Sequence, residues 1–218
     1  SIDESVRRSF GGDLVITPAS FDGGFDPGFA TALAEQPEVA TAVGLSVPAV
    51  LIDDEVADVV VLNTAQLDAV FDTDVREGSM ADMRADQLAV SATRARAEGW
   101  SLGSPVELTT ADGTAVPLTV GVIFGASDVL GDLLVSSDTL VGLGVRERHI
   151  VVMVDLADGV SMAEGRTVVG AVAAPYAGAA VEDLDEYTAS VAGEVNQALA
   201  LVYVLLVLAV VIAVMGIG

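Results

Sequence analysis

Cysteine and lysine are both absent from the 218-residue chain, and histidine occurs once, at position 149. Without cysteine the chain can form neither a disulfide framework nor a cysteine-ligated zinc site. Without lysine it cannot contain the phosphate loop of P-loop ATPases. The G-x-S-x-G motif of α/β-hydrolases is also missing. We therefore predict no enzyme activity, no catalytic residue and no cofactor, and we interpret His149 as a structural residue.

Basic residues are few, with 9 Lys and Arg against 32 Asp and Glu, which gives a formal net charge of -23. Such a surface repels nucleic-acid phosphates and anionic lipid, so we predict no nucleic-acid partner. We interpret the acidity as a charged coat that keeps the protein in solution.

The acidic residues gather in several short groups that resemble candidate cation ligands. The segment "DTDVREG" departs from the EF-hand loop, because Arg76 stands at the fifth position and Glu77 at the sixth. We predict no metal site, with calcium binding as the open alternative. The groups are Asp22/Asp26, Asp53/Asp54/Glu55, Asp72/Asp74 and Asp183/Asp185/Glu186.

Charge is also missing from the last segment, Ala198 to Gly218. A helix of about 21 residues is roughly 31 Å long, which matches a hydrocarbon core of about 30 Å. The segment is apolar on every face, unlike an amphipathic surface helix. It predicts a transmembrane span, with a buried central helix of a soluble domain as the alternative. Its members include Ala198, Leu199, Tyr203, Leu206, Val210, Val214 and Gly218.

A stalk helix is predicted upstream of this span. Acidic residues such as Asp185 favour a helix start, because they lie near the positive end of the helix dipole. Val191 and Val195 recur four residues apart and continue at Leu199, on one helical face. We predict one stiff helix from about Asp185 through the span. Because the chain starts at Ser1, which is not an initiator Met, and stops at the span, we expect it to be an internal piece of a longer protein or a processed product.

The rest of the chain shows alternating strand and helix patterns. Asp26 and Pro27 predict the start of a helix with Phe29, Ala30 and Leu33 on its buried face. One strand is predicted over "EVATAVGLSVPAVLIDD" at 38–54 and another at 56–63, joined at residues 53–55, and two more strands surround Asp112-Gly113; both turns are hairpin signals. A strand at 88–91 leads into a helix at 92–98, which Gly99 ends. Further predicted elements are a strand at 12–18, helices at 64–72, 137–141 and 158–176, and strands at 148–156 and 178–184.

The repeat of strand, turn, helix and strand at both ends predicts an α+β fold. It consists of a porter-like β-α-β subdomain in two halves around a small inserted α/β lobe, followed by a long C-terminal transmembrane helix. We place the first half at 1–84, the lobe at 85–145, the second half at 146–184, and the stalk with its span at 185–218.

The segment "LAVSATRARAEGWSLGSPVELTTADGTAVPLTVGVIF" is similar to a part of MacB/FtsX-type ABC-transporter permeases. "EGS" at residues 77–79 fits the usual lead-in, and "LVYVLLVLAVVIAVMGIG" resembles the start of the span that follows the domain in that family. The order and spacing of these short motifs carry the resemblance. The matching residues are 88–91, Gly99, Leu102-Gly103, Asp112-Gly113 and 118–122.

This resemblance implies a MacB-like periplasmic core domain in a permease subunit. Its partners would be a separate cytoplasmic ATPase, a second permease protomer and the lipid bilayer. Residues 1 to about 197 would lie outside the cell membrane. The implied function is mechanical transmission of ATP-driven movement for export or extraction of a substrate.

Two other classes of protein stay open. One is a membrane-anchored binding or adhesion module without a transport role. The other is a membrane-tethered hydrolase, which would need a catalytic group such as two close carboxylates in a cleft.

Overall fold

The computed structural model describes residues 12–18, 23–71, 73–125, 130–141, 143, 145, 147–176 and 178–190. The chain divides into two compact units, Ser1–Val181 and Glu182–Gly218. The first unit contains two β-sheets with their covering helices. The second begins within the last strand and continues into a helix at residues 184–190.

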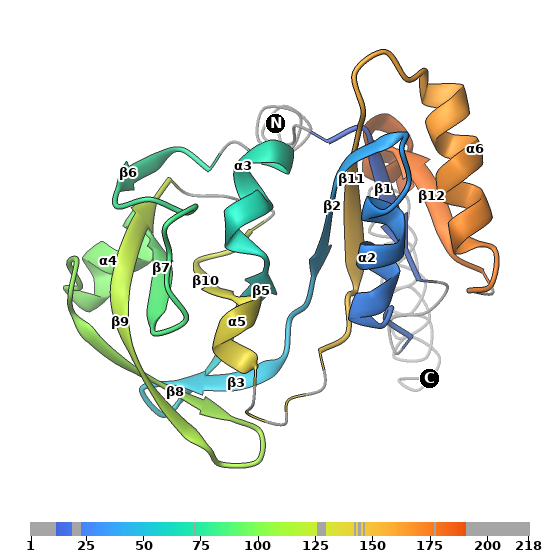
Figure 1. Ribbon diagram of the computed structural model, residues 1–218. Coiled ribbons are helices and arrows are strands. Elements are labelled where there is room, and N and C mark those ends of the chain that lie inside the picture. The colour runs from blue at the N-terminus through green and yellow to red at the C-terminus, as the bar shows by residue number, and fades with distance from the viewer. Residues whose placement is uncertain are drawn as a thin grey trace, which may run out of the picture. The chain divides into compact units, whose positions relative to one another are not determined.

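The smaller sheet has four strands in the order β12-β1-β11-β2, and β11 runs antiparallel to both β1 and β2. Two helices pack on one face of it (Figure 1). Phe29, Leu33 and Val169 of these helices share a buried core with strand residues such as Ile16 and Val154. The elements are β1 (Leu14–Thr17), α2 (Pro27–Ala34), β2 (Val39–Leu45), β11 (Val151–Leu156), α6 (Met162–Ala173) and β12 (Ala180–Asp183).

Helix α2 begins where the sequence predicts it. Asp26 is the N-cap residue with extended backbone, and Pro27 takes the first helical position. Proline is tolerated there because the first N–H groups of a helix have no intrahelical partner. Phe29, Ala30 and Leu33 are buried, so the predicted apolar face is confirmed.

The larger sheet has eight strands in the order β4-β3-β8-β9-β7-β10-β5, with β6 paired to β9. It is mixed, because β7 runs parallel to β9 and β10 parallel to β5, while the other neighbouring strands run antiparallel. Its strands are β3 (Ala49–Ile52), β4 (Glu55–Asp58), β5 (Val60–Leu62), β6 (Val75–Glu77), β7 (Gln87–Ser91), β8 (Pro105–Thr110), β9 (Ala115–Phe124) and β10 (Leu133–Ser136). Its helices are η1 (Thr64–Gln66), α3 (Leu67–Val70), α4 (Ala92–Glu98) and α5 (Ser137–Leu140).

Local signals in this sheet are confirmed by the structure. The β3–β4 hairpin turns at Asp53 and Asp54, both with positive φ, as a tight hairpin turn requires. The β8–β9 hairpin turns at Gly113, whose φ is +85°. Helix α4 spans Ala92–Glu98, with the Ser91 hydroxyl accepting from the Arg94 N–H and Gly99 in the left-handed conformation at its end.

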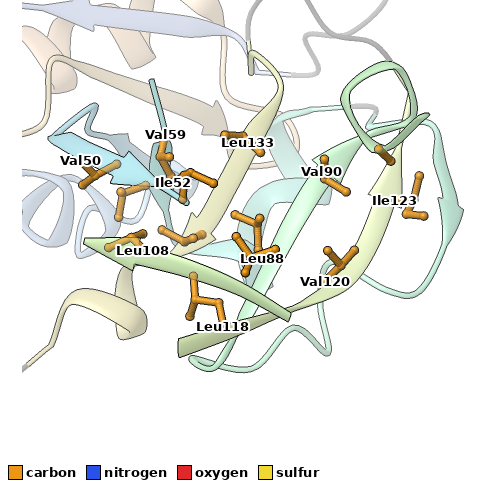
Figure 2. Packing of buried hydrophobic residues seen from close by; sticks show 14 of the residues in the cluster. Val50, Ile52, Val59, Leu88, Val90, Leu108, Leu118, Val120, Ile123 and Leu133 are labelled. Carbon is orange, nitrogen blue, oxygen red and sulfur yellow. The ribbon is translucent and has the colours of Figure 1, made fainter. Parts of the chain in front are cut away.

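Both faces of the central strands are buried. Leu88 and Val90 of β7 belong to one core, together with Ile52 of β3, Leu108 of β8 and Val120 of β9, and Figure 2 shows these side chains lying together. The residue between them, Ala89, belongs to a second core on the opposite face. This alternation follows from the period-two geometry of a strand.

The second core joins the two sheets. It contains Leu62 and Leu134 of the larger sheet and Val43, Leu45 and Met153 of the smaller one. Ser46 and Val61 also exchange two backbone hydrogen bonds of 2.9 and 2.8 Å, which connect β2 to β5. We therefore expect the two sheets to unfold together.

The segment "EVATAVGLSVPAVLIDD" was expected to form one strand, and this expectation is wrong. Strand β2 ends at Leu45, and β3 begins at Ala49, after Val47 and Pro48. Proline has no N–H for a ladder hydrogen bond, so the chain leaves the smaller sheet here and enters the larger one. Strands on both sides of residue 84 thus share the larger sheet. The domain limits at residues 84, 145 and 184 stay a prediction.

Within the part of the chain that the structure describes, no helix has the length and apolar character needed to cross a membrane. The predicted span at 198–218 lies outside the described residues, as do Val191 and Val195 of the predicted stalk.

Candidate functional site

The predicted stalk starts with a capped helix. Residues 184–190 are helical, and Asp185 lies in the first turn. The Glu186 N–H donates to Asp183 Oδ1 at 2.9 Å, and the Asp183 N–H donates to Glu186 Oε2 at 3.0 Å. This reciprocal pair is a capping box, which satisfies two N–H groups that a helix start otherwise leaves without partners.

Two further hydrogen bonds hold the same segment. The Ser190 hydroxyl donates to Glu182 Oε1 at 2.8 Å, and the Thr188 hydroxyl donates to the Leu184 carbonyl at 2.7 Å. Because β12 ends at Asp183 and the helix begins at 184, no loop residue separates strand from helix. The acidic residues here were predicted from the helix dipole, whereas the capping box was not predicted, although the Asp-x-x-Glu spacing was its signal.

A second feature is a groove of about 340 Å³ along one edge of β2. Residues of α2 and β2 form one side of it. Asn63 and Gln66, which follow β5, and Ser137, which follows β10, form the other side. Glu147 and His149 also line it. This groove was not predicted from the sequence, because its walls come from five separated segments of the chain.

His149 is buried, with 6% of its surface exposed. Its backbone pairs with Phe25 through two hydrogen bonds, which agrees with a structural role. The imidazole lies over Gly44, where a Cβ would come within 2.0 Å of Nδ1. Position 44 therefore has no room for a side chain while the imidazole is there.

The two nitrogens of His149 have different surroundings. Nε2 lies 3.3 Å from Glu147 Oε1. Nδ1 is buried and has no hydrogen-bond partner among the described residues. If Nε2 carries the proton and donates it to Glu147, Nδ1 keeps an unused lone pair. Ser137 lines the same groove, but no hydrogen bond joins it to His149, so the geometry supports no nucleophilic triad.

Two members of the acidic groups make structural hydrogen bonds, one at a turn and one at a helix cap. Asp53 Oδ1 accepts from the Glu107 N–H at 2.9 Å, and Asp183 caps the helix described above. Among the described residues, no three His, Asp or Glu side chains are placed to hold a metal ion. Asp22 and Asp72 lie outside the described residues.

No protein-family model matches the sequence, and no curated protein matches it. Solved structures do match. The periplasmic region of MacB from Actinobacillus actinomycetemcomitans is similar with a TM-score of 0.63 and 11% identity, over 87% of this chain and 97% of that one. The extracellular domain of the ABC-type transporter YknZ from Gram-positive bacteria is similar with a TM-score of 0.54 and 16% identity, over 79% of this chain and 98% of that one.

The chain therefore has the α+β fold of a MacB-like periplasmic domain, and the resemblance found in its sequence is confirmed for the fold. Identities of 11% and 16% carry the likeness no further than the fold.

Proposed function

We propose that this chain is the extracytoplasmic domain of an ABC-transporter permease subunit. The fold supports this role, because the similar YknZ structure is the extracellular domain of an ABC-type transporter and the similar MacB structure is a periplasmic region. In this role the chain is no enzyme. It passes the movement of a separate cytoplasmic ATPase to a substrate that is exported or extracted.

The observation that carries the mechanical part of the proposal is the junction at Asp183. A strand passes into a helix without a loop residue, and a capping box holds the first turn. A flexible linker would absorb a displacement, whereas a capped helix keeps its length and direction under small loads. The helix that begins at 184 is thus the proposed stalk, to which Asp185, Val191 and Val195 belong.

The same proposal assigns the partners and the location. The stalk continues into a membrane span at 198–218, which includes Tyr203, Leu206 and Val210. The acidic domain, residues 1 to about 197, faces water outside the cell membrane. A second permease protomer completes a dimer, and the ATPase binds on the cytoplasmic side.

The test uses the full-length permease with its ATPase in lipid nanodiscs. Four glycines are inserted after Ser190 in one variant, and four alanines in the control. Four residues add about one helical turn, so the alanine insertion keeps the helix stiff and in nearly the same orientation. Glycine costs about 1 kcal/mol per helical residue relative to alanine and makes the stalk flexible.

We expect the glycine variant to hydrolyse ATP while its extracytoplasmic domain no longer moves, and the alanine variant to keep both properties. A label at Ala111→Cys reports the movement, since these 218 residues contain no other cysteine. Equal movement in the two variants would refute the stalk. A full-length protein that binds no ATPase would instead favour a membrane-anchored binding module.

A further inference from the structure

One edge of β2 has backbone groups without a strand partner, and Ala42 and Gly44 on this edge are buried at the floor of the groove. Ser46 exchanges two hydrogen bonds with Val61, so its N–H and C=O point out of the smaller sheet. The backbone C=O of Leu45 points the other way, because it accepts from the Ile150 N–H at 2.8 Å. Successive residues of a strand alternate in this respect. The N–H and C=O of Gly44 and Ala42 therefore point to the same side as those of Ser46.

That side is the groove, which Ala42 and Gly44 both line. In the described residues β2 is the last strand of its sheet, and only Ser46 pairs beyond it. A strand edge with unpaired N–H and C=O groups is a template for another extended chain. The small residues at 42 and 44 allow a second backbone to approach closely.

The polar groups of the groove favour a basic occupant. The Glu147 side chain is 20% exposed, and its Oε1 lies 3.3 Å from His149 Nε2. No Arg stands among the described residues that line the groove. The Glu147 carboxylate therefore makes the groove negative, and the net charge of -23 attracts cations over a longer range.

We propose that the groove binds an extended basic segment of another polypeptide by β-strand addition. The backbone of this segment pairs with Ala42 and Gly44 and continues the short pairing of Ser46 with Val61. One of its lysine or arginine side chains reaches the carboxylate of Glu147. Asn63 and Gln66 on the opposite wall supply side-chain amides for its outer backbone groups. This proposal does not depend on the transport role.

The probe is a fluorescein-labelled octapeptide of alternating lysine and valine, titrated by anisotropy into the full chain in nanodiscs of zwitterionic lipid. We expect saturable binding that weakens with salt, because the contact is between opposite charges. Glu147→Gln is expected to weaken binding about tenfold, since charge-assisted hydrogen bonds are the strong ones. Glu107→Gln, an exposed glutamate on β8, is the matched control and leaves binding unchanged.

Two methylated peptides separate strand addition from charge attraction. One carries N-methyl groups on its lysines and the other on its valines. In an added strand only alternate N–H groups point to β2, so one peptide is expected to lose at least about tenfold in affinity while the other binds as before. Hydrogen exchange of residues 39–46 slows with the peptide bound, and that of 105–124 does not.

Three results would overturn the proposal. The two methylated peptides bind equally, or the two glutamate variants weaken binding equally, or spermine competes as well as the unmethylated peptide. The last result would identify a site for organic cations without strand addition.

Discussion

Gly44 and His149 are expected to depend on each other. The backbone of Gly44 does not have positive φ, so alanine is allowed there by conformation. A Cβ would nevertheless lie 2.0 Å from Nδ1 and 2.2 Å from Cε1 of His149, which is far inside van der Waals contact. Gly44→Ala therefore forces the buried imidazole, together with its contact to Glu147, out of place.

Gly44→Ala is expected to lower the free energy of unfolding in the natural chain and to raise it in a His149→Ala chain. In the natural chain, overpacking a filled site costs about 1–3 kcal/mol in the free energy of unfolding. In a His149→Ala background the space is open, and alanine should be more stable than glycine in a strand interior by roughly 0.5–1 kcal/mol. The coupling free energy between the two positions is thus about 1.5–4 kcal/mol, the sum of these two ranges.

The assay is urea unfolding of the full chain in detergent, followed by the fluorescence of Trp100, the single tryptophan, which packs against the core of the larger sheet. Gly170→Ala is the control, because nothing lies within 4 Å of its added Cβ in the interior of α6. It should stabilise the protein slightly. Additive effects of Gly44→Ala and His149→Ala would refute the steric argument.

Three further predictions follow from single contacts. Glu186→Ala removes one half of the capping box, so amide exchange of residues 184–190 should speed up by a factor that corresponds to about 0.5–2 kcal/mol; unchanged exchange would contradict the cap. Leu88→Ala opens a cavity at a side chain with 0% exposure and should lower the free energy of unfolding by about 2–5 kcal/mol, whereas a loss below 1 kcal/mol would mean that the core relaxes around it. Burial, then the neighbouring Asp13 and Asp158, raises the pKa of Asp155 above its usual value. A group with a raised pKa stabilises the fold below its ordinary pKa, and this contribution is lost as pH rises through the folded-state pKa. Asp155→Asn should therefore stabilise the protein at pH 7 and lose this advantage near pH 3 in denaturation midpoints, and a gain that does not depend on pH would contradict the assigned cause.

Local sequence signals predicted much of the secondary structure. Helix α4 lies between its caps Ser91 and Gly99, and α2 begins after Asp26 with Pro27 in its first position. Such signals can be found in the sequence because caps and turns depend on residues close in the chain. The Asp53-Asp54 and Asp112-Gly113 turns are of the same kind. The alternation of Leu88, Ala89 and Val90 was visible as an apolar run, but both faces are buried, so the run alone could not indicate which core receives which side chain.

Features that depend on distant segments were beyond sequence reasoning. The residues on both sides of Pro48 were predicted to form one strand, so the passage of the chain from β2 to β3 in the larger sheet was not predicted. His149 was identified as structural from its apolar surroundings, but its contact with Gly44 joins residues more than a hundred positions apart. The groove combines residues of α2, β2 and the segment around Glu147, and no spacing along the chain announces it.

The most direct test of the account is the movement of this domain in response to ATP. A spin label is attached at Ala111→Cys in the full-length permease, which is assembled with its ATPase in nanodiscs. The distance between the labels of the two protomers is measured by pulsed electron paramagnetic resonance with ADP and with ATP under conditions that block hydrolysis. The account predicts two different distance distributions, and the difference should vanish in the variant with four glycines after Ser190. Identical distributions with ADP and ATP in the protein without the insertion would contradict it.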